Sequence, residues 1–549
     1  MWKLKISTAL LMLNGFILQS SFAQQSFSQP KLIIGIVVDQ MRSDYIYRYW
    51  NKLGNDGFKR LIREGFECKN TQYNYIPTYT GPGHASIYTG TTPAIHGIIG
   101  NNWYDPLSKS VVYCVADTSY HAIGESGGQV SPGRLLSTTI GDELNLFSNF
   151  RSKVIGISLK DRAAVLPAGK SGLAYWLDEN STNFITSNYY ISKRQPELPK
   201  WLIEFNKRKL PAFYLDTIWK PLYDIKSYTE STDDNNLYEQ SLVLSPGAQP
   251  VFDYDLRKLD KSDHDLIKKT PFGNSLLKDF AIATIEGEKL GKDEFSDMLL
   301  ISFSSTDYVG HNYATHAIET EDTYLRLDLE IADFLKYLDQ KLGKDNVLLF
   351  LTADHGVMQN PVFMNDNKLP GGYVVSSSIA DTIRYFFRNK YKNAAIFSYY
   401  INDQVWLNDS LLTELKINKK IVIEELSSFL MRLPNVADVV SKYQLQNAEY
   451  LEGRRSLLQN GFNFQRSGDI AIIFNPGYIE RSGSGKGTTH SSLYKYDTSV
   501  PLLWYGWNIR PGFMINRVNI TDIAATLAIM LNICQPSGCS GKPIDALIR

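Results

Sequence analysis

Three apolar runs, each ending in an aspartate, constrain the fold of this 549-residue chain more than any other feature. They read LIIGIVVD, MLLISFSSTD and VLLFLTAD and end at Asp39, Asp307 and Asp354. Continuous runs rich in valine, isoleucine and leucine are typical of strands that are buried on both faces of a parallel sheet. Residues 324–338 lie between the last two runs and repeat apolar side chains every three or four positions, which predicts a crossover helix. We therefore predict an α/β fold, with a further strand at residues 153–159.

The chain begins with the pattern of a secretory signal peptide. Lys3 and Lys5 precede an apolar stretch at residues 6–18, and small residues follow it. The alternative is an uncleaved membrane anchor, but the stretch is short for a span of about 20 residues. We predict a signal peptide over residues 1–23 and a periplasmic or secreted catalytic domain over residues 24–549, with no membrane span once the signal peptide is removed.

Two stretches, residues 171–280 and 365–480, interrupt the regular pattern. They are rich in tyrosine, asparagine and lysine and show weaker periodicity. We expect them to be insertions that form caps or a smaller lobe around a functional site. The chain carries 57 basic and 57 acidic side chains, and this balance gives no reason to expect a nucleic acid partner.

Four cysteines suit an exported protein with disulfides. Cys534 and Cys539 are separated by a short Gln-Pro-Ser-Gly turn, and Cys68 and Cys114 would form the other pair. A metal site made of all four cysteines is the alternative, but it needs CxxC-type spacing that this chain lacks. We therefore predict the disulfides Cys68–Cys114 and Cys534–Cys539.

Three of the 8 histidines stand close to acidic or glycine-rich segments. His355 directly follows Asp354, His311 follows Asp307 by four residues, and His490 lies in the sequence GTTH. A spacing of four can place both side chains on one side of a helical turn. A single aspartate after a strand is usually a turn or cap residue. In open α/β sheets, however, ligands bind beyond the carboxyl ends of the strands, so three such aspartates are expected to converge on one site.

The chemistry of these side chains indicates a pair of metal ions. Oxygen and imidazole ligands without thiolates favour zinc, with manganese or iron as the alternatives. Six ligands are too many for one tetrahedral zinc ion, but they suit two metal ions that share a site. Paired metals about 3.5 to 4 Å apart stabilise the attacking and the leaving oxygen in phosphoryl transfer. The residues by themselves therefore predict a hydrolase that acts on phosphate esters.

Seven segments of the chain resemble the alkaline phosphatase superfamily, and within it the PafA-type alkaline phosphatases of periplasmic bacteria. The segments read VVDQMRSDY, PTYTGPGH, IHGIIGNNWYD, SLKDRAAVLPAG, STDYVGHN, TADHG and KGTTHSS. The resemblance extends from about Lys31 to the C-terminus. It implies an alkaline phosphatase-like sandwich with a central, mostly parallel sheet flanked by helices, and it also implies a monomer.

The resemblance further implies two zinc ions. The implied ligands are Asp307, His311 and His490 for one ion, and Asp39, Asp354, His355 and the nucleophile Thr80 for the other.

Two threonines, Thr78 and Thr80, compete for the role of nucleophile in the sequence TYTGPGH. The resemblance aligns the nucleophile of the family with Thr80 and leaves Thr78 as a turn or loop residue. We expect a helix to begin near Gly83, so that free N–H groups and the helix dipole favour an anion beside Thr80. A threonine hydroxyl is a poor nucleophile until a metal lowers its pKa. The alternative for Thr80 is a helix N-cap, and His84 is expected to be structural or to support the site.

Three further residues align with substrate-binding positions that also act in catalysis. Asn101 would donate a hydrogen bond to a phosphate oxygen, and Lys160 and Arg162 would follow the strand at residues 153–159. An arginine fork can hold two phosphate oxygens, and a lysine adds a point charge. A dianionic monoester carries more charge on its terminal oxygens than a diester does, so this pair of cations favours monoesters.

The resemblance thus implies an alkaline phosphatase of broad specificity that hydrolyses small-molecule phosphate monoesters through a covalent phosphothreonine intermediate. A phosphodiesterase or nucleotide pyrophosphatase of the same superfamily is the first alternative. A sulfatase is less favoured, because those families place cysteine or serine before x-Pro-x-Arg, whereas this chain has Thr-x-Pro-x-His. A non-catalytic phosphate- or zinc-binding protein is the alternative from a different class.

Overall fold

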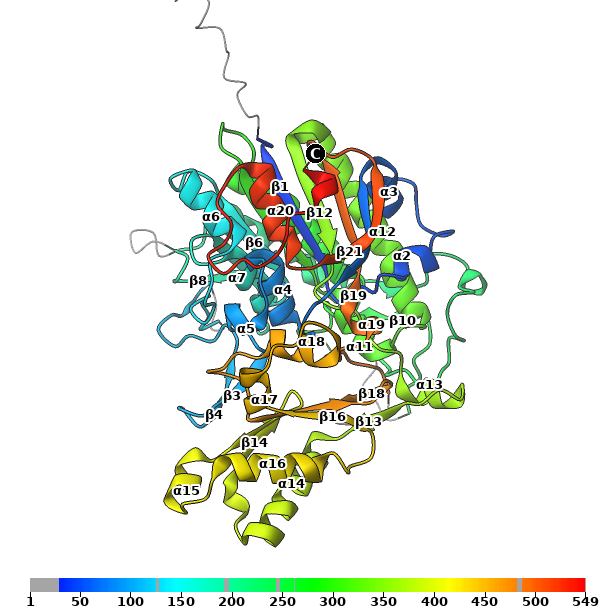
Figure 1. Cartoon of the computed structure of the whole chain (residues 1–549). Coiled ribbons are helices and arrows are strands. Elements are labelled where there is room, and N and C mark those ends of the chain that lie inside the picture. Colours follow the sequence, from blue (N-terminus) through cyan, green and yellow to red (C-terminus); the bar gives the residue numbers. More distant parts are fainter. Residues whose placement is uncertain are drawn as a thin grey trace, which may run out of the picture.

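A computed structural model provides the structure of the chain (Figure 1). It describes residues 29–124, 128–191, 197–242, 247–260, 262–480 and 486–548. The predicted signal peptide lies outside the described residues. Within those residues, no helix combines the length and the apolar character that are needed to cross a lipid bilayer.

A mixed sheet of eleven strands lies at the centre of the described part of the chain (Figure 1). In order across the sheet the strands are β19 (Ser499–Val500), β2 (Phe66–Gln72), β20 (Leu502–Gly506), β12 (Val347–Thr352), β1 (Leu32–Val38), β11 (Asp297–Phe303), β6 (Val154–Ser158), β7 (Leu173–Leu177), β8 (Phe184–Ser187) and β5 (Ala122–Ile123), and β21 (Gly512–Asn519) pairs with β2. The five strands from β12 to β7 run parallel to one another. The predicted α/β fold with a mostly parallel central sheet is confirmed.

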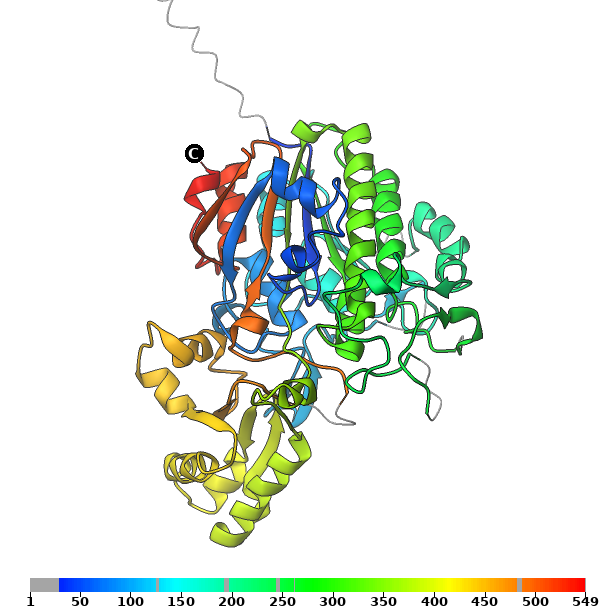
Figure 2. The ribbon, with the colours of Figure 1, turned by 90° about the vertical axis from the view of Figure 1, so that its right-hand side faces the viewer.

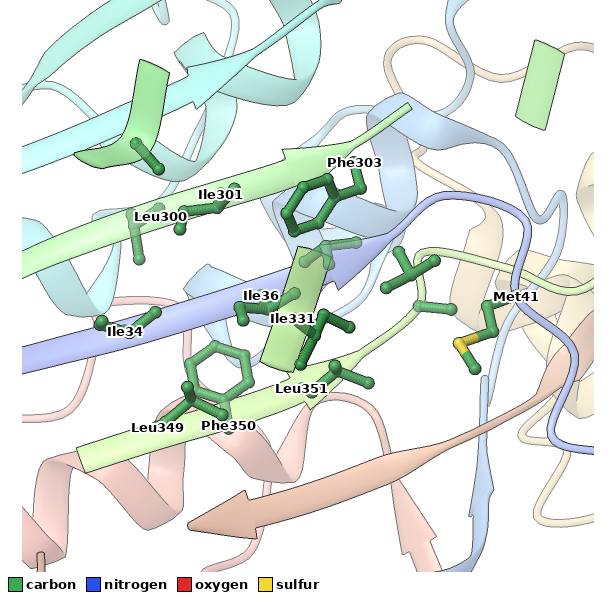
Figure 3. Packing of buried hydrophobic residues seen from close by; sticks show 14 of the residues in the cluster. Ile34, Ile36, Met41, Leu300, Ile301, Phe303, Ile331, Leu349, Phe350 and Leu351 are labelled. Carbon is green, nitrogen blue, oxygen red and sulfur yellow. The ribbon is translucent and has the colours of Figure 1, made fainter. Parts of the chain in front are cut away.

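The core lies around β1, β11 and β12, in which every residue is buried. Figure 3 shows Ile331 packed against side chains of these strands, among them Ile36 and Leu351. Burying one such side chain stabilises the fold by about 1.5–3 kcal/mol. All three apolar runs that were predicted to be strands are strands, because only a position between two helical layers buries both faces of a run without polar alternation.

Helices cover both faces of the sheet, and Figure 2 shows α20 on one side and α10 and α12 on the other. The first layer contains α4 (Thr80–Thr89), α6 (Ile140–Phe147), α7 (Asp161–Ala168) and α20 (Asp522–Leu531). The opposite layer contains α8 (Lys200–Lys207), α10 (Phe272–Glu288), α11 (Ser305–Tyr313) and α12 (Ile318–Lys341). The predicted crossover helix is confirmed as part of α12, whose buried side chains repeat with helical spacing.

A second, smaller sheet belongs to the small lobe, which we define as residues 372–480 (Figure 1). Its strands are, in order across the sheet, β14 (Phe397–Ile401), β15 (Gln404–Leu407), β17 (Ile470–Phe474) and β16 (Val436–Ser441), and they pack with α14 (Ser376–Tyr391) and α16 (Lys419–Leu430). The lobe has its own cluster of buried apolar side chains, including Phe387, Val405 and Leu426. It can therefore hold its shape without borrowing side chains from the main core.

The small lobe contacts a hairpin of the main body formed by β3 (Asn102–Asp105) and β4 (Ser110–Tyr113). Asn402 donates a hydrogen bond from Nδ2 to the carbonyl of Asn102 over 2.7 Å. The ring of Tyr399 stacks on that of Tyr104 with 5.2 Å between centroids. These contacts attach the lobe to the segment that directly follows Asn101.

The remaining elements are short and lie mostly at the surface or in the connections. The helices among them are α2 (Tyr45–Arg48), α3 (Phe58–Glu64), α5 (Pro93–His96), α9 (Leu210–Tyr214), α13 (Pro361–Asp366), α15 (Asp409–Glu414), α17 (Lys442–Asn447), α18 (Gly453–Gly461) and α19 (Lys495–Thr498). The strands among them are β9 (Ile218–Trp219), β10 (Tyr254–Asp255), β13 (Gly372–Val374) and β18 (Tyr478–Glu480).

The prediction of two disulfides was wrong, because all four cysteines are free thiols. Cys68 is buried in the main core on β2, whereas Cys114 is buried in a different apolar cluster. Cys539 is partly buried and packs against Gly90, whereas Cys534 is exposed. Burial raises the pKa of Cys68 and of Cys114 to about 12, so both behave as small apolar groups.

We expect all four thiols to react with Ellman's reagent when the purified protein is unfolded in guanidinium chloride without a reductant. In the native protein the exposed Cys534 should react first, since the buried thiols are protonated and shielded. The measurement is the number of thiols released per chain before and after reduction. A rise on reduction would contradict the free-thiol assignment.

Candidate active site

Three aspartates reach one edge of the sheet because their strands are parallel and end at the same level. Val38 of β1 lies opposite Phe303 of β11, and Val37 lies opposite Thr352 of β12. The chain leaves each strand at the carboxyl edge, where ligands bind in open α/β sheets. The aspartates that follow these ends, all buried, are Asp39, Asp307 and Asp354.

Three histidines meet these aspartates, and each has its Nδ1 atom bonded to a backbone carbonyl. Nδ1 of His311 bonds to the carbonyl of Thr488 at 2.8 Å, Nδ1 of His355 to that of Gly356 at 2.9 Å, and Nδ1 of His490 to that of Thr78 at 2.6 Å. A carbonyl only accepts, so each Nδ1 donates its proton, and a neutral ring in this orientation would have its lone pair on Nε2. Metal-binding histidines are oriented by this kind of hydrogen bond.

The Nε2 atoms converge on the carboxylates. Nε2 of His311 lies 3.1 Å from Oδ1 of Asp307, as expected for residues four apart on α11. Nε2 of His490 lies 3.7 Å from the same oxygen. Nε2 of His355 lies 3.5 Å from Oδ1 of Asp39.

Two groups of three side chains in the described part of the chain are close enough to hold a metal ion. One group is Asp39, Asp354 and His355, and the other is Asp307, His355 and His490. His355 therefore lies between the two groups, where its ring stacks on that of His490 with 3.5 Å between centroids. The first group has the membership that the resemblance implied, while in the second group His355 stands where His311 was expected.

Three ligand atoms at this site are buried without a hydrogen-bond partner: Oδ1 of Asp39, Oδ2 of Asp354 and Nε2 of His355. A buried polar atom without a partner costs about 1–3 kcal/mol, and more when it is charged. Oxygen and imidazole donors whose free electron pairs point to one place suit a divalent metal ion. The residues present therefore fit a metal site.

The electrostatics of the site also favour added positive charge. Burial, with Asp307 as the next cause, raises the pKa of Asp39 to about 6. Burial and the charge of Asp39 raise the pKa of Asp354 well above its ordinary value. Burial lowers the pKa of His355 to about 3, so its imidazole is neutral at physiological pH. The carboxylates thus repel one another, and a bound cation would relieve that repulsion.

Lys160 brings a cation between the two groups. Its Nζ lies 2.7 Å from Oδ2 of Asp39 and 2.6 Å from Oδ2 of Asp307. Lys160 stands at the N-cap position of α7, directly beyond the end of β6. Burial lowers its pKa, but the carboxylates of Asp307 and Asp39 outweigh that effect, so the ammonium stays charged.

The helix that carries Thr80 begins at Thr80 itself. The prediction that it begins near Gly83 was wrong, because Tyr79 is the N-cap residue and no side chain caps the helix. The start of α4 also offers fewer free N–H groups to an anion than expected. The N–H of Gly81 donates to Oδ1 of Asn101 over 2.7 Å, and that of Gly83 donates to the carbonyl of Tyr79. Pro82 has no N–H group. An anion beside Thr80 must therefore be held mainly by side chains.

Glycine at position 83 lets α4 approach the loop after β12. A Cβ on Gly83 would lie 2.4 Å from the carbonyl oxygen of Asp354. His84 is bonded through both ring nitrogens, at 2.9 Å to the carbonyl of Thr80 and at 2.9 Å to Oγ of Ser302. His84 is therefore structural, as expected, and it fixes the first turn of α4 against β11.

Asn101 and Arg162 approach the start of α4 from two further elements. Because Oδ1 of Asn101 accepts from Gly81, its Nδ2 donors are directed elsewhere. Nη1 of Arg162 bonds to the hydroxyl of Tyr113 at 3.3 Å, and the buried Nε of Arg162 has no hydrogen-bond partner. Tyr113 and Asn101 belong to one hairpin, since the N–H of Cys114 bonds to the carbonyl of Asn101 at 2.9 Å.

Two residues that support the site were missed from the sequence. Gln40 lies in the left-handed backbone region with φ 67°, and its Nε2 donates to Oδ1 of Asp307 over 2.6 Å. Its N–H also donates to Oδ1 of Asp354 over 3.2 Å. The other residue is Tyr113, which orients Arg162. Neither was predictable, because both act through partners that are distant in sequence.

Comparisons with known proteins agree with this geometry. Residues 33–495 match the family described as type I phosphodiesterase / nucleotide pyrophosphatase. A protein of Myroides odoratus named calcium-transporting ATPase is 43% identical over 549 residues, which cover 99% of each chain. Alkaline phosphatase PafA of Elizabethkingia meningoseptica is 43% identical over 95% of each chain.

Solved structures of alkaline phosphatase PafA match the whole fold. The wild type has a TM-score of 0.92 at 42% identity, over 96% of this chain and 100% of that chain. A variant with substitutions at a threonine, an asparagine, a lysine and an arginine has a TM-score of 0.91 at 41% identity, over the same shares. The chain belongs to the type I phosphodiesterase and nucleotide pyrophosphatase family, and within the alkaline phosphatase superfamily it is of the PafA type.

We expect Gly83→Ala to lower both the melting temperature and the metal content. The added methyl group would lie 2.4 Å from the carbonyl oxygen of Asp354, so α4 and the Asp354 loop must separate, at a cost of about 1–3 kcal/mol. Calorimetry and elemental analysis of metal per chain measure the two effects. Gly133→Ala is the control, because its Cβ would meet only the side chains of Ser131 and Asp117, at 3.1 and 3.3 Å. Equal values for both variants would contradict the packing argument.

Proposed function

We propose that the chain is an alkaline phosphatase that hydrolyses phosphate monoesters with broad specificity at a two-zinc site. The observation that carries the proposal is the set of buried ligand atoms without partners, on Asp39, Asp354 and His355, beside the helix that starts at Thr80. The names of the PafA relatives agree with it. Release of a terminal phosphate from ATP would use the same chemistry, so the ATPase name of another relative is compatible with it.

The proposed ligands are the side chains named from the sequence. Asp307, His311 and His490 would hold one zinc ion, and Asp39, Asp354 and His355, with Thr80, would hold the other. Supporting this, all three histidines have Nδ1 tied to a backbone carbonyl and Nε2 turned toward a carboxylate. Two bound zinc ions would act as Lewis acids that lower the pKa of a hydroxyl or a water and neutralise charge on the leaving oxygen.

Thr80 is the proposed nucleophile. Its Oγ attacks phosphorus in line with the ester oxygen, so that a P–Oγ bond forms and the bond to the leaving alcohol breaks. The hydroxyl proton of Thr80 passes to solvent water, and the leaving alkoxide takes a proton from water. In a second step a water molecule attacks the phosphothreonine from the opposite side, which releases phosphate and restores the hydroxyl. The packing of Gly83 on Asp354 and the bond from His84 to the Thr80 carbonyl hold the nucleophile in place.

Asn101, Lys160 and Arg162 are the proposed phosphate-binding residues. Asn101 has its Oδ1 fixed by Gly81 and can donate through Nδ2, and Arg162 has a buried Nε without a partner. Preorganised donors of this kind stabilise charge that develops on the non-bridging oxygens. The four residue types substituted in the PafA variant are those of Thr80, Asn101, Lys160 and Arg162, and both pairs have the same sequence spacing in the two chains.

The proposal extends to the organisation of the chain. We propose that residues 1–23 are a signal peptide, that the enzyme is periplasmic or secreted, and that it works as a monomer. We also propose that residues 365–480 form an insertion that borders the site. The contact of Asn402 with the segment next to Asn101 supports this role. The expected insertion at residues 171–280 is corrected in part, because β7 and β8 lie in the central sheet and α10 covers it.

We expect the zinc-loaded enzyme to hydrolyse p-nitrophenyl phosphate much faster than bis-p-nitrophenyl phosphate. Thr80→Ala should lower kcat/KM for the monoester by about 10³-fold or more, because the attacking oxygen is lost. Thr80→Ser should keep a measurable rate and trap labelled phosphate on the serine at low pH. A preference for the diester would favour the phosphodiesterase alternative. Tight phosphate binding without turnover would favour the non-catalytic one.

We expect Lys160→Ala and Arg162→Ala each to lower kcat/KM for the monoester by about 10²–10³-fold, as for the loss of one preorganised donor. The diester should lose less, because it carries less charge on its terminal oxygens. The ratio of the two kcat/KM values is therefore the measurement. Lys170→Ala, at an exposed lysine at the end of the same segment, is the control and should leave the ratio unchanged. An equal loss for both substrates would contradict the proposed role in specificity.

A further inference from the structure

A second group of acidic side chains lies outside the two ligand groups of the candidate active site. Glu239 is on the connection between β9 and β10, and Glu319 is in the first turn of α12. Asp234, on the same connection as Glu239, adds a third negative charge that acts on both glutamates. None of these residues belongs to the two ligand groups of the active site.

Both glutamates are buried and each has an oxygen without a partner. Glu239 is 1% exposed and Glu319 is fully buried. Oε2 of each has no hydrogen-bond partner, and both carboxyl groups act on the buried hydroxyl of Tyr313. Oε1 of Glu319 accepts a hydrogen bond from the hydroxyl of Tyr254. Asp234 is already satisfied, because it accepts the N–H of Phe252.

Positive charge near the pair is scarce. No ion pair joins either glutamate to a lysine, arginine or histidine of the described residues, and the cation that acts on Glu239 is Lys486. Burial raises the pKa of Glu239 to about 11 and that of Glu319 to about 8, and repulsion between neighbouring carboxylates adds to the first shift. Two buried carboxyl groups in this position need either a proton or a cation.

The kinds of ligand atom around Glu239 and Glu319 determine which cation would suit this site. The available atoms are carboxylate and hydroxyl oxygens, with no imidazole or thiolate among them. Calcium prefers such hard oxygen ligands and accepts six to eight of them in irregular geometry, whereas magnesium requires a near-ideal octahedron. The two unpartnered Oε2 atoms, with the charge of Asp234, can supply the anionic part of such a shell. We propose that Glu239 and Glu319 bind a calcium ion.

The position would couple this ion to the active site. The segment around Glu239 is hydrogen-bonded on one side to the loop that leads to His490, since the carbonyl of Tyr238 accepts the N–H of Gly487 over 2.6 Å. On the other side the N–H of Gln240 donates to the carbonyl of Asn312 over 2.9 Å, next to His311 on α11. Calcium bound by Glu239 and Glu319 would hold these segments together. It would thereby fix the backbone next to His311 and the loop that leads to His490.

The test uses the full-length enzyme with zinc already bound, so that added ions do not fill the active site. Equilibrium dialysis with calcium measures ions per chain, and terbium luminescence excited through tyrosine reports an ion close to Tyr254 and Tyr313. The wild type should bind one calcium ion with a Kd of about 10⁻³ M or lower and should show terbium emission. Glu239→Gln and Glu319→Gln should each weaken calcium binding by about 10-fold or more while the zinc content stays unchanged.

Asp253→Asn is the matched control, because it removes a half-exposed carboxylate from the same segment without touching the pair. It should bind calcium as the wild type does. Absence of calcium and terbium binding by the wild type would overturn the proposal and leave a shared proton as the state of the glutamates. Undiminished binding by both glutamine variants would overturn it as well.

If neither variant folds, anomalous diffraction from terbium in wild-type crystals decides whether the ion lies between Glu239 and Glu319. Phosphatase activity enters none of these measurements, so the result is independent of the proposed function.

Discussion

The site depends on the parallel register of β1, β11 and β12, which places three strand ends at one level of the sheet. Every residue of these strands is buried, so a slip in register would expose apolar side chains and would also separate the aspartates that follow the strands. The same packing that stabilises the core therefore sets the distances at the site. Helix α12 locks the arrangement by covering the strands on one face, as Figure 3 illustrates for Ile331.

Such an arrangement concentrates negative charge where water is excluded. Burial and mutual repulsion raise the pKa values of Asp39 and Asp354, and the ammonium of Lys160 opposes both shifts. The rest of the structure keeps the ligand atoms in place despite the repulsion: backbone carbonyls orient three histidines, and Gln40 bonds to Asp307 and Asp354. Without a bound ion, the buried carboxylates repel one another and destabilise the fold. A bound cation removes that repulsion, so the same arrangement favours cation binding. Glu239 and Glu319 are a second case of buried carboxylates with unpartnered oxygens, and there the nearby donors are oxygen atoms alone.

Much of this was predictable from local pattern. Apolar runs that end in aspartate, a helix of regular spacing between two of them, and the Asp-x-x-x-His pair of α11 are properties of contiguous residues, and the structure has each of them. The errors arose where distant contacts decide. The thiols of Cys68 and Cys114 lie in different clusters, and α4 begins three residues earlier than expected, at Thr80 instead of Gly83. Short-range signals do not contain the partners that settle such questions.

The sequence by itself determined the fold class and the kinds of side chain available for chemistry. Both follow from local patterns, namely the spacing of apolar residues and the types of ligand side chain. Only the tertiary structure decided which ligand group each side chain joins and which partners hold it in place. His355 lies between two ligand groups, Lys160 joins the carboxylates of Asp39 and Asp307, and Tyr113 orients Arg162. The physical reason is that each of these contacts joins segments that are far apart in the chain. Their distances are therefore set by strand register and helix packing.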